Sequence, residues 1–242
     1  MNPAKRIAST LLVLALGATT ACGQTGRRTD EPVKESATPM SEPQARDLTL
    51  VVRTKTAPRP QPSVADHELV PGPSGNGLLI DYAVTNTGAK PVVLNDRIPV
   101  QDGSASGPSD QIDPLKAFVL AGPDSGVTIA KRTFVQSGGP DFTVSFQGTV
   151  VQPGKTVRGR AFAPLPLELA GPGFNTSERH SGTLPDPVSA WRLCLGVTPE
   201  LYQPDVLPDG KHSMVPNGDL AGDRRQRLLC SDPAPLPGGS RA

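Results

Sequence analysis

The sequence has few histidines, no large excess of charge and no long apolar run. Its 242 residues include three His, and 24 Lys and Arg nearly balance 23 Asp and Glu. A balanced charge gives no overall field that would recruit nucleic acid or an acidic membrane surface. The apolar run of residues 7–16 is too short to span a bilayer as a permanent helix. These absences argue against a nucleic-acid-binding protein and against a permanent span at this run.

Stretches of about 10 to 15 residues with the spacing of an amphipathic helix are also missing from the sequence. Gly and Pro, with 25 and 28 copies, make up about a fifth of the chain. Proline lacks a backbone donor and glycine loses much backbone entropy on folding, so both suit turns better than helix interiors. The composition predicts an all-β protein and argues against parallel strands connected by helices.

The amino-terminal segment has the layout of a secretory signal. Lys5 and Arg6 precede the apolar run, small residues follow it, and Cys22 comes next. This layout predicts a signal peptide over residues 1–21. The segment resembles the lipobox of bacterial lipoproteins, in which the cysteine thiol is diacylglycerylated and becomes the new amino terminus. The resemblance implies lipid attachment at Cys22, with fatty chains such as palmitate, and anchoring at the extracytoplasmic face of a bacterial membrane.

An unlipidated form is the alternative. The lipobox family prefers Leu three residues before the cysteine, and this chain has Thr19 there. Thr19 and Ala21 are small enough for an ordinary signal peptidase, which would cut at the same bond and release a secreted or periplasmic soluble protein. An exposed free thiol outside the cytoplasm is a liability, which favours lipidation of Cys22. Removal of residues 1–21 would leave a formal charge of −1, because two of the 24 basic residues are lost.

The chain divides by composition into four segments. Residues 23–45 are rich in Thr, Ser, Pro, Glu, Lys and Arg and nearly lack large apolar residues. Such a segment cannot bury enough surface to offset its ordering entropy, so we expect residues 22–45 to be a lipidated cysteine followed by a disordered tether. A similar disordered tail is expected at residues 231–242. Residues 46–230 would then form one folded domain.

Within residues 46–230 the pattern predicts short strands divided by turns. The clearest strand is residues 78–85, in which Leu78, Ile80, Tyr82 and Val84 would share one face. A turn at residues 86–89 would then lead into a returning strand. The other strands are expected at residues 48–53, 91–94, 115–120, 127–135, 142–146, 156–162, 191–197 and 228–230.

Two turn motifs add a resemblance to this pattern. The first is Val84-x-Asn86-x-Gly88, and the second is the Pro153-Gly154 turn that opens residues 156–162. Together they resemble the immunoglobulin-like domains of secreted bacterial lipoproteins. The resemblance implies an immunoglobulin-like antiparallel β-sandwich and assigns no catalytic residue.

Cys194 and Cys230 are the cysteines that remain once Cys22 is assigned to lipid. An oxidising compartment and an even number of remaining cysteines favour a disulfide between them. Closing a loop of 35 residues would contribute roughly 4 kcal/mol in the chain-entropy model. The competing interpretation is a metal site, but no His or third Cys lies at ligand spacing.

One polar loop offers the residue types of a hydrolase. His180, Ser181 and Asp186 supply a base, a nucleophile and an acid within a few residues. Triad members normally come from separate elements, and no G-x-S-x-G elbow is present, so a solvated loop explains the same residues. A secreted hydrolase that uses His180 or His212 remains an alternative function.

Two further patterns are candidate metal sites. His212-Ser213-Met214 resembles the H-x-M pairs of periplasmic copper carriers, although only Met40 in the tether could add a further methionine. A second segment has oxygen-bearing side chains at the first, third, fifth, ninth and twelfth positions of a calcium loop of the EF-hand kind. Its candidate ligands are Asp102, Ser104, Ser106, Asp110 and Asp113.

The sequence therefore predicts a lipid-anchored extracytoplasmic lipoprotein with a non-enzymatic binding or structural role in the cell envelope. Its partners would be the membrane, through Cys22, and an envelope protein of unknown identity, with no nucleic acid and no cofactor. Long loops expected at residues 98–114, 171–187 and 203–226 could form a recognition surface. A calcium, copper or small-ligand binding protein is the alternative from another class, beside the hydrolase.

Overall fold

The computed structural model divides the chain into two units, Met1–Met40 and Ser41–Ala242. The structure describes residues 46–62, 74–100, 111–123, 125–134, 146–171, 184, 186–199, 201, 205–215 and 226–237. All of these residues belong to the second unit.

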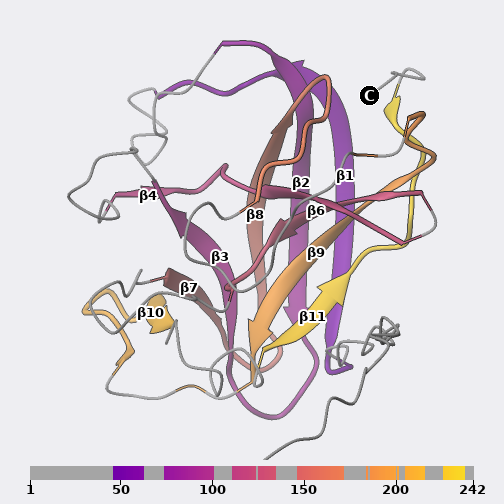
Figure 1. The fold of residues 1–242 in the computed structure, drawn as a ribbon. Coiled ribbons are helices and arrows are strands. Elements are labelled where there is room, and N and C mark those ends of the chain that lie inside the picture. Colours follow the sequence, from indigo (N-terminus) through magenta and orange to yellow (C-terminus); the bar gives the residue numbers. More distant parts are fainter. Residues whose placement is uncertain are drawn as a thin grey trace, which may run out of the picture. The chain divides into compact units, whose positions relative to one another are not determined.

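The second unit is built from strands (Figure 1). The described residues form strands and no α-helix, which confirms the prediction of an all-β protein. In chain order the strands are β1 (Leu48–Pro58), β2 (Asn76–Asn86), β3 (Val92–Pro99), β4 (Ile112–Asp113), β5 (Phe118–Ala121), β6 (Val127–Lys131), β7 (Phe146–Val151), β8 (Thr156–Pro164), β9 (Trp191–Thr198), β10 (His212–Val215) and β11 (Arg227–Cys230).

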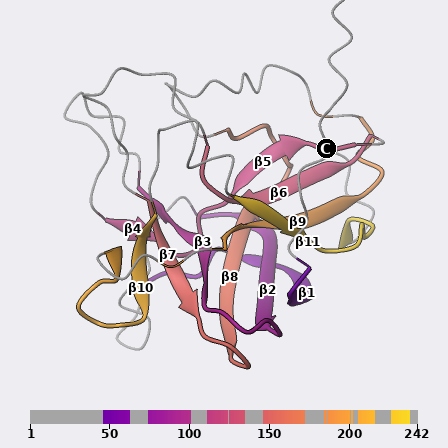
Figure 2. The same ribbon diagram turned by 90° about the horizontal axis from the view of Figure 1, so that it is seen from below.

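The strands form two sheets, which Figure 2 shows as separate layers. The smaller sheet has the order β1-β2-β8, with both neighbouring pairs antiparallel. The larger sheet has the order β10-β7-β3-β9-β6-β5, and β11 and β4 pair with β9 and β3. Two sheets of different size therefore supply the surfaces that enclose the core.

The main core lies between the two sheets. The alternation expected for residues 78–85 is confirmed, because Leu78, Ile80, Tyr82 and Val84 of β2 are at most 3% exposed. They belong to one apolar cluster with residues of the larger sheet, including Leu94, Ile129, Leu193 and Leu195. Burial of such a shared apolar surface is the dominant favourable contribution to folding.

The hairpin prediction for the turn at residues 86–89 is wrong, because the strand that follows this turn does not pair with β2. Instead β3 enters the larger sheet, where it pairs with β7 and β9. The turn crosses between the sheets because the Asn86 side chain donates to Val151 O (2.9 Å) and Lys90 O (2.8 Å) while its Oδ1 accepts from Gly88 N–H. β3 is buried along most of its length, at Asn95 and Asp96 as well as at its apolar residues, which suits a central strand covered on both faces.

The expectation of purely antiparallel sheets is wrong for one pair. β6 and β9 run parallel, from Val127 opposite Trp191 to Lys131 opposite Leu195. The chain between them includes β7 in the larger sheet and β8 in the smaller sheet. The parallel pair thus arises from strands that cross between the sheets.

Two segments that were expected to be loops contain strands. β4 lies within residues 98–114, and β10 lies within residues 203–226. Both are short, with two and four residues, and the hydrophobic alternation that marks a strand in sequence is weak over such lengths.

The folded part also extends past the boundary expected at residue 230. Ala234 pairs with Trp191 through backbone hydrogen bonds in both directions, each 2.8 Å long. Trp191 Nε1–H donates to Pro235 O, and Leu236 is 9% exposed and belongs to the main core. The prediction of a disordered tail is therefore wrong for residues 231–237. The partner for this proline-rich stretch comes from β9, which is distant in sequence.

Candidate functional site

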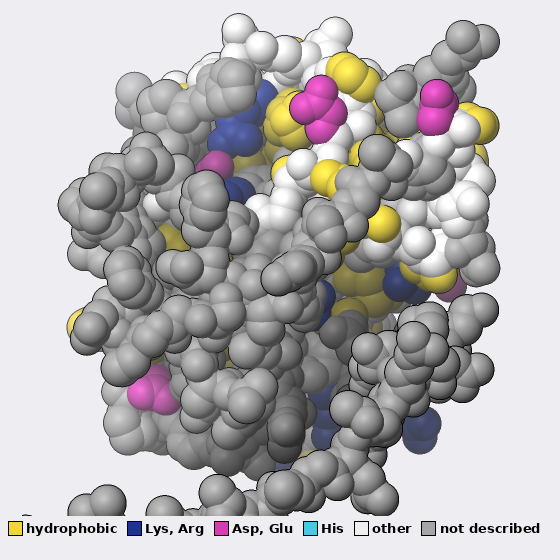
Figure 3. Space-filling view, in the orientation of Figure 1, with side chains coloured by type: hydrophobic (Ala, Val, Ile, Leu, Met, Phe, Trp, Pro, Cys, Tyr) yellow, Lys and Arg dark blue, Asp and Glu magenta, His cyan; other side chains and the backbone are white. Residues whose placement is uncertain are grey.

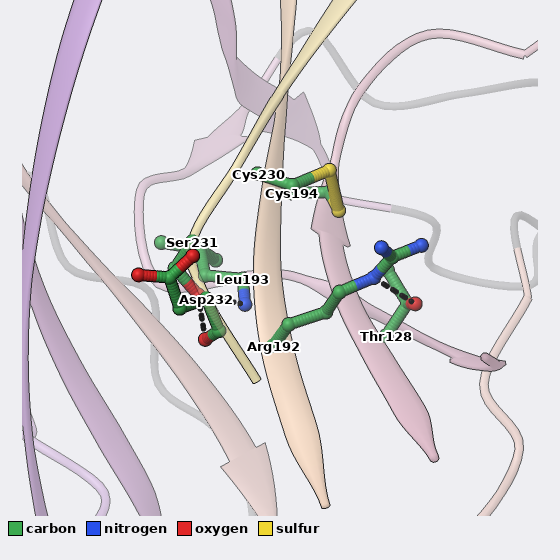
Figure 4. Close-up of a disulfide and its surroundings, with 7 residues drawn as sticks. All are labelled: Thr128, Arg192, Leu193, Cys194, Cys230, Ser231 and Asp232. Atoms are coloured by element: carbon green, nitrogen blue, oxygen red, sulfur yellow. Dashed lines mark hydrogen bonds between the residues drawn. A yellow bond between two sulfur atoms is a disulfide. The ribbon is translucent and has the colours of Figure 1, made fainter. Parts of the chain in front are cut away.

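The predicted disulfide is confirmed. β11 pairs antiparallel with β9, and the pairing places Cys230 directly opposite Cys194, with a Cα–Cα distance of 4.1 Å. Figure 4 shows the disulfide beside Arg192, whose Nε–H donates to Thr128 Oγ1 (3.3 Å). The bond therefore holds β11 to the central part of the larger sheet. Cys22 lies outside the described residues.

One residue of the predicted calcium loop is described. Asp113, in β4, forms an ion pair with Arg59 (Oδ2–Nη2, 2.7 Å), and its Oδ1 accepts from the Leu115 N–H. Both carboxylate oxygens are thus engaged within the fold, at a residue that is 8% exposed. The other four candidate ligands, Asp102, Ser104, Ser106 and Asp110, lie outside the described residues.

His212 lies at the start of β10 between an acid and a base. Its Nδ1 contacts Asp209 Oδ2, and its Nε2 lies 3.2 Å from Arg97 Nη1. Hydrogen bonds from the Lys211 backbone and from His212 lower the pKa of Asp209 to about 2. Both ring nitrogens of His212 therefore have partners within the protein.

The neighbours of His212 do not complete a catalytic or copper-binding arrangement among the described residues. Ser213 is 1% exposed, and its hydroxyl donates to Asp205 O and Met214 O. Met214 is half-buried on the same side of β10 as His212, whose nitrogens are already engaged. Of the hydrolase loop only Asp186 is described, because His180 and Ser181 lie outside the described residues.

A buried polar cluster connects the two sheets. The Tyr82 hydroxyl of β2 donates to Asp96 Oδ2 of β3 (3.0 Å). The other oxygen of Asp96 accepts from the Thr149 hydroxyl (2.8 Å) and the Thr149 N–H (3.2 Å). Burial, followed by the Asp96 charge, raises the pKa of Tyr82 well above its ordinary value of 10.0. Tyr82 therefore stays protonated and acts as a hydrogen-bond donor between the sheets.

Lys131 is the second buried polar group of this region. Its side chain leaves the end of β6, and the residue is 1% exposed. The ammonium donates to Pro114 O (2.6 Å) and to Arg160 O of β8 (2.9 Å), and it lies 5.8 Å from the centre of the Tyr82 ring. Burial lowers the pKa of Lys131 to about 8, although the charges of Asp96 and Asp113 partly oppose this.

The outer face of the smaller sheet carries all the charged side chains of its three strands. Cross-strand register places Arg53, Asp81 and Arg160 in one row. The next row contains Arg158, together with Val51 and Ala83. We call this surface the basic face and define it by Val51, Arg53, Lys55, Asp81, Ala83, Arg158 and Arg160.

A shallow groove of about 440 Å³ runs over the basic face. Arg53, Arg158 and Arg160 all line it, and Asp81 is the single acidic residue in the three strands. Val51 is 58% exposed, the largest exposure of a hydrophobic side chain in this groove. The groove thus combines an excess of positive charge with an exposed apolar side chain.

A second hollow, of about 430 Å³, lies where β1 approaches β11. Leu50, Val52 and Trp191 contribute to its lining. Figure 3 shows hydrophobic side chains at the floor of a hollow to the right of centre, where β1, β9 and β11 lie in Figure 1. The apolar lining of this hollow continues into the main core.

The basic face was not predicted, although the sequence contains a signal for it. Basic residues alternate with other residues in β1, at Arg53 and Lys55, and again in β8, at Arg158 and Arg160. This spacing places each pair on one face of a strand. The two pairs are more than 100 positions apart in sequence, and the pairing of β1 and β8 with β2 brings them onto one surface.

No protein-family model, curated protein or solved structure matches the chain. Within the described ranges, the structure contains no helix long and apolar enough to cross a membrane. The same residues contain no group of three or more His, Cys, Asp or Glu side chains placed to share a metal ion.

Proposed function

We propose that this protein is a lipid-anchored lipoprotein of the bacterial cell envelope with a non-enzymatic binding or structural role. The observation that carries the proposal is Cys22, directly after a leader of basic, apolar and small residues. Cleavage before Cys22 and acylation of its thiol would supply more than one buried fatty chain, which is sufficient for stable anchoring. The folded part would then lie at the extracytoplasmic face of the membrane.

The disulfide supports an extracytoplasmic location. Cys194 and Cys230 are joined across two adjacent strands, and such bonds persist in oxidising compartments and are rare in the cytosol. A tether of residues 22–45 would separate the lipid from the first strand, which begins at Leu48.

We assign the domain an immunoglobulin-like sandwich topology as part of the same proposal. Two features support this assignment: the Asn86 turn leads from β2 in the smaller sheet to β3 in the larger one, and the Pro153-Gly154 turn leads from β7 to β8 in the opposite direction. Gly154 has a φ of 68°, a conformation that favours glycine. Sandwiches of this kind display binding surfaces and do not by themselves imply catalysis.

The geometry of the buried polar groups favours a binding or structural role over catalysis. The Tyr82–Asp96 bond and the bond from Lys131 to Arg160 O each join strands of the two sheets. Groups used in this way stabilise the arrangement of the sheets. The basic face, by contrast, presents charged side chains to solvent.

Metabolic labelling with a clickable palmitate analogue tests the proposal. We expect the label on the wild-type chain, partition of that chain into the detergent phase, and loss of the label in Cys22→Ser. The double variant Cys194→Ser/Cys230→Ser is the matched control, because it removes two other cysteines and should keep the label. A wild-type chain that carries no label and stays in the aqueous phase would refute lipid anchoring.

A further inference from the structure

We propose that the basic face docks on the anionic lipid headgroups of the membrane that carries the anchor. The inference rests on the proposed lipid anchor and extends it, because it assigns the folded domain a second contact with the same membrane. The occupant is a lipid surface, and the contact is made by the outer face of β1, β2 and β8.

The sheet register gathers the cations of the basic face into a compact array. Arg53 and Arg160 lie on either side of Asp81 in one row, and Arg158 lies in the adjacent row. Neighbouring strands are about 4.8 Å apart, and residues two apart along a strand are about 6.8 Å apart. The backbone positions of the three arginines therefore lie within roughly 12 Å of one another, so they can contact neighbouring headgroups together.

Three of the four cations on this face have no partner among the residues that the structure describes. Arg53, Lys55, Arg158 and Arg160 oppose one carboxylate, that of Asp81. The side chains of Arg53, Lys55 and Arg158 form no hydrogen bond or ion pair with any residue that the structure describes. Among the described residues of this face, positive charge is therefore in local excess, on a chain whose mature form would be close to neutral overall, and positive side chains near an anionic leaflet are attracted to it.

Val51 favours a membrane over a soluble anionic polymer. It lies in the same row as Arg158 and is 58% exposed. A polymer bound through its phosphates would leave this apolar surface in water, whereas the headgroup region can accommodate an apolar side chain beside cationic ones.

The position of β1 also favours the membrane that carries the anchor. β1 belongs to the basic face and begins at Leu48, directly after the expected tether. A flexible tether of 24 residues has a root-mean-square span of about 27 Å. Such a tether would keep the whole domain, and the basic face with it, within reach of the lipid surface at a high effective concentration.

Vesicle sedimentation of the full chain with Cys22→Ser tests the docking without any attached lipid. The vesicles contain phosphatidylcholine alone or phosphatidylcholine with 30 mol% phosphatidylglycerol, and the added variant is Arg53→Gln/Arg158→Gln. We expect the double substitution to weaken binding to the anionic vesicles by about 25-fold, or about fivefold for each charge removed. Binding to neutral vesicles, to which the leader contributes equally in both chains, should not change.

The matched control is Lys211→Gln/Arg227→Gln. These two exposed residues lie outside the basic face, and their side chains also form no interaction with a described residue. The control should bind anionic vesicles like the parent, and Arg53→Lys/Arg158→Lys should retain most of the binding. Melting curves check that all variants remain folded.

Three results would overturn the docking proposal. The first is an equal loss of binding to anionic vesicles in the Arg53/Arg158 and Lys211/Arg227 variants. The second is binding that does not depend on phosphatidylglycerol. The third is abolition of vesicle binding by soluble polyphosphate that is added at the same phosphate concentration as the vesicles. The vesicle-sedimentation result could still be interpreted if palmitate labelling failed, because the tested chain carries no acyl group. Failure of vesicle binding would in turn leave the labelling result intact.

Discussion

Lys131 makes the stability of the domain depend on pH in a defined direction. Burial lowers the pKa of its ammonium from the ordinary 10.5 to about 8. Below pH 8 the folded and unfolded states both carry the proton, and the charged form costs the folded state about 3 kcal/mol. Between pH 8 and 10.5 the folded state loses the proton that the unfolded state keeps. Stability therefore rises with pH across this window.

The expected rise is on the order of 2 kcal/mol between pH 8 and pH 10. Burial also lowers the pKa of Lys116, which adds to the rise. Above pH 10 the raised pKa of Tyr82 acts in the opposite direction, because the unfolded phenol loses its proton while the folded one keeps it. We thus expect maximal stability near pH 10.

Urea unfolding measured at pH 7, 8, 9 and 10 provides the assay. Trp191 is the single tryptophan and is 3% exposed, so its fluorescence reports the loss of the core. Lys131→Met removes the buried amine but leaves Pro114 O and Arg160 O without their donor, so its stability at one pH is a balance of opposing effects. The informative quantity is the slope: the variant should keep only the smaller rise due to Lys116. A flat wild-type profile from pH 8 to 10, or an equal slope in both proteins, would contradict this account of Lys131.

Further predictions concern the disulfide, the Tyr82 cluster and the surface groups. Reduction of the Cys194–Cys230 bond should lower the free energy of unfolding by about 4 kcal/mol, and unchanged denaturant midpoints with and without reductant would refute this. Gly159→Ala should cost about 1 to 3 kcal/mol, because its Cβ would lie 2.3 Å from the Tyr82 ring and hydroxyl. Gly75→Ala meets no atom within 4 Å and should be near neutral, so equal thermal melting shifts in the two glycine variants would argue against packing as the cause.

Local sequence patterns predicted the elements that depend on local physics. The alternation in residues 78–85 identified the buried side of β2, since one face of that strand packs against the other sheet. The even number of cysteines that remains once Cys22 is assigned to lipid, together with an oxidising compartment, predicted a covalent link that the structure places between β9 and β11. In both cases the signal lies within a few residues or in a chemical property of one residue type.

The order of the strands in the sheets could not be predicted from local sequence patterns. The Asn86 turn looks like a hairpin connection, but its side chain bonds to Val151, 65 positions away, and directs the chain into the other sheet. The parallel neighbours β6 and β9 are likewise separated by two strands in sequence. Such pairings depend on long-range contacts, which periodicity does not encode.

The polar groups were equally hard to assign from sequence. Lys131 lies within residues 127–135, for which the sequence predicts a strand, and nothing in that pattern indicates that its ammonium group is buried. It is buried because the carbonyl oxygens of Pro114 and Arg160 accept its hydrogen bonds. The basic face requires the register of β1, β2 and β8 before its alternating arginines become one surface. His212, a candidate catalytic or copper-binding residue by sequence, contacts Asp209 and Arg97 in the structure.

The most direct test of the envelope-lipoprotein account is the mass of the amino-terminal tryptic peptide from the native protein. Trypsin should release residues 22–27, because Arg27 follows the cysteine by five positions. The account predicts that this peptide begins at Cys22 and carries the mass of a thioether-linked diacylglycerol. A peptide with unmodified Cys22, or one that still contains residues of the 1–21 leader, would contradict it.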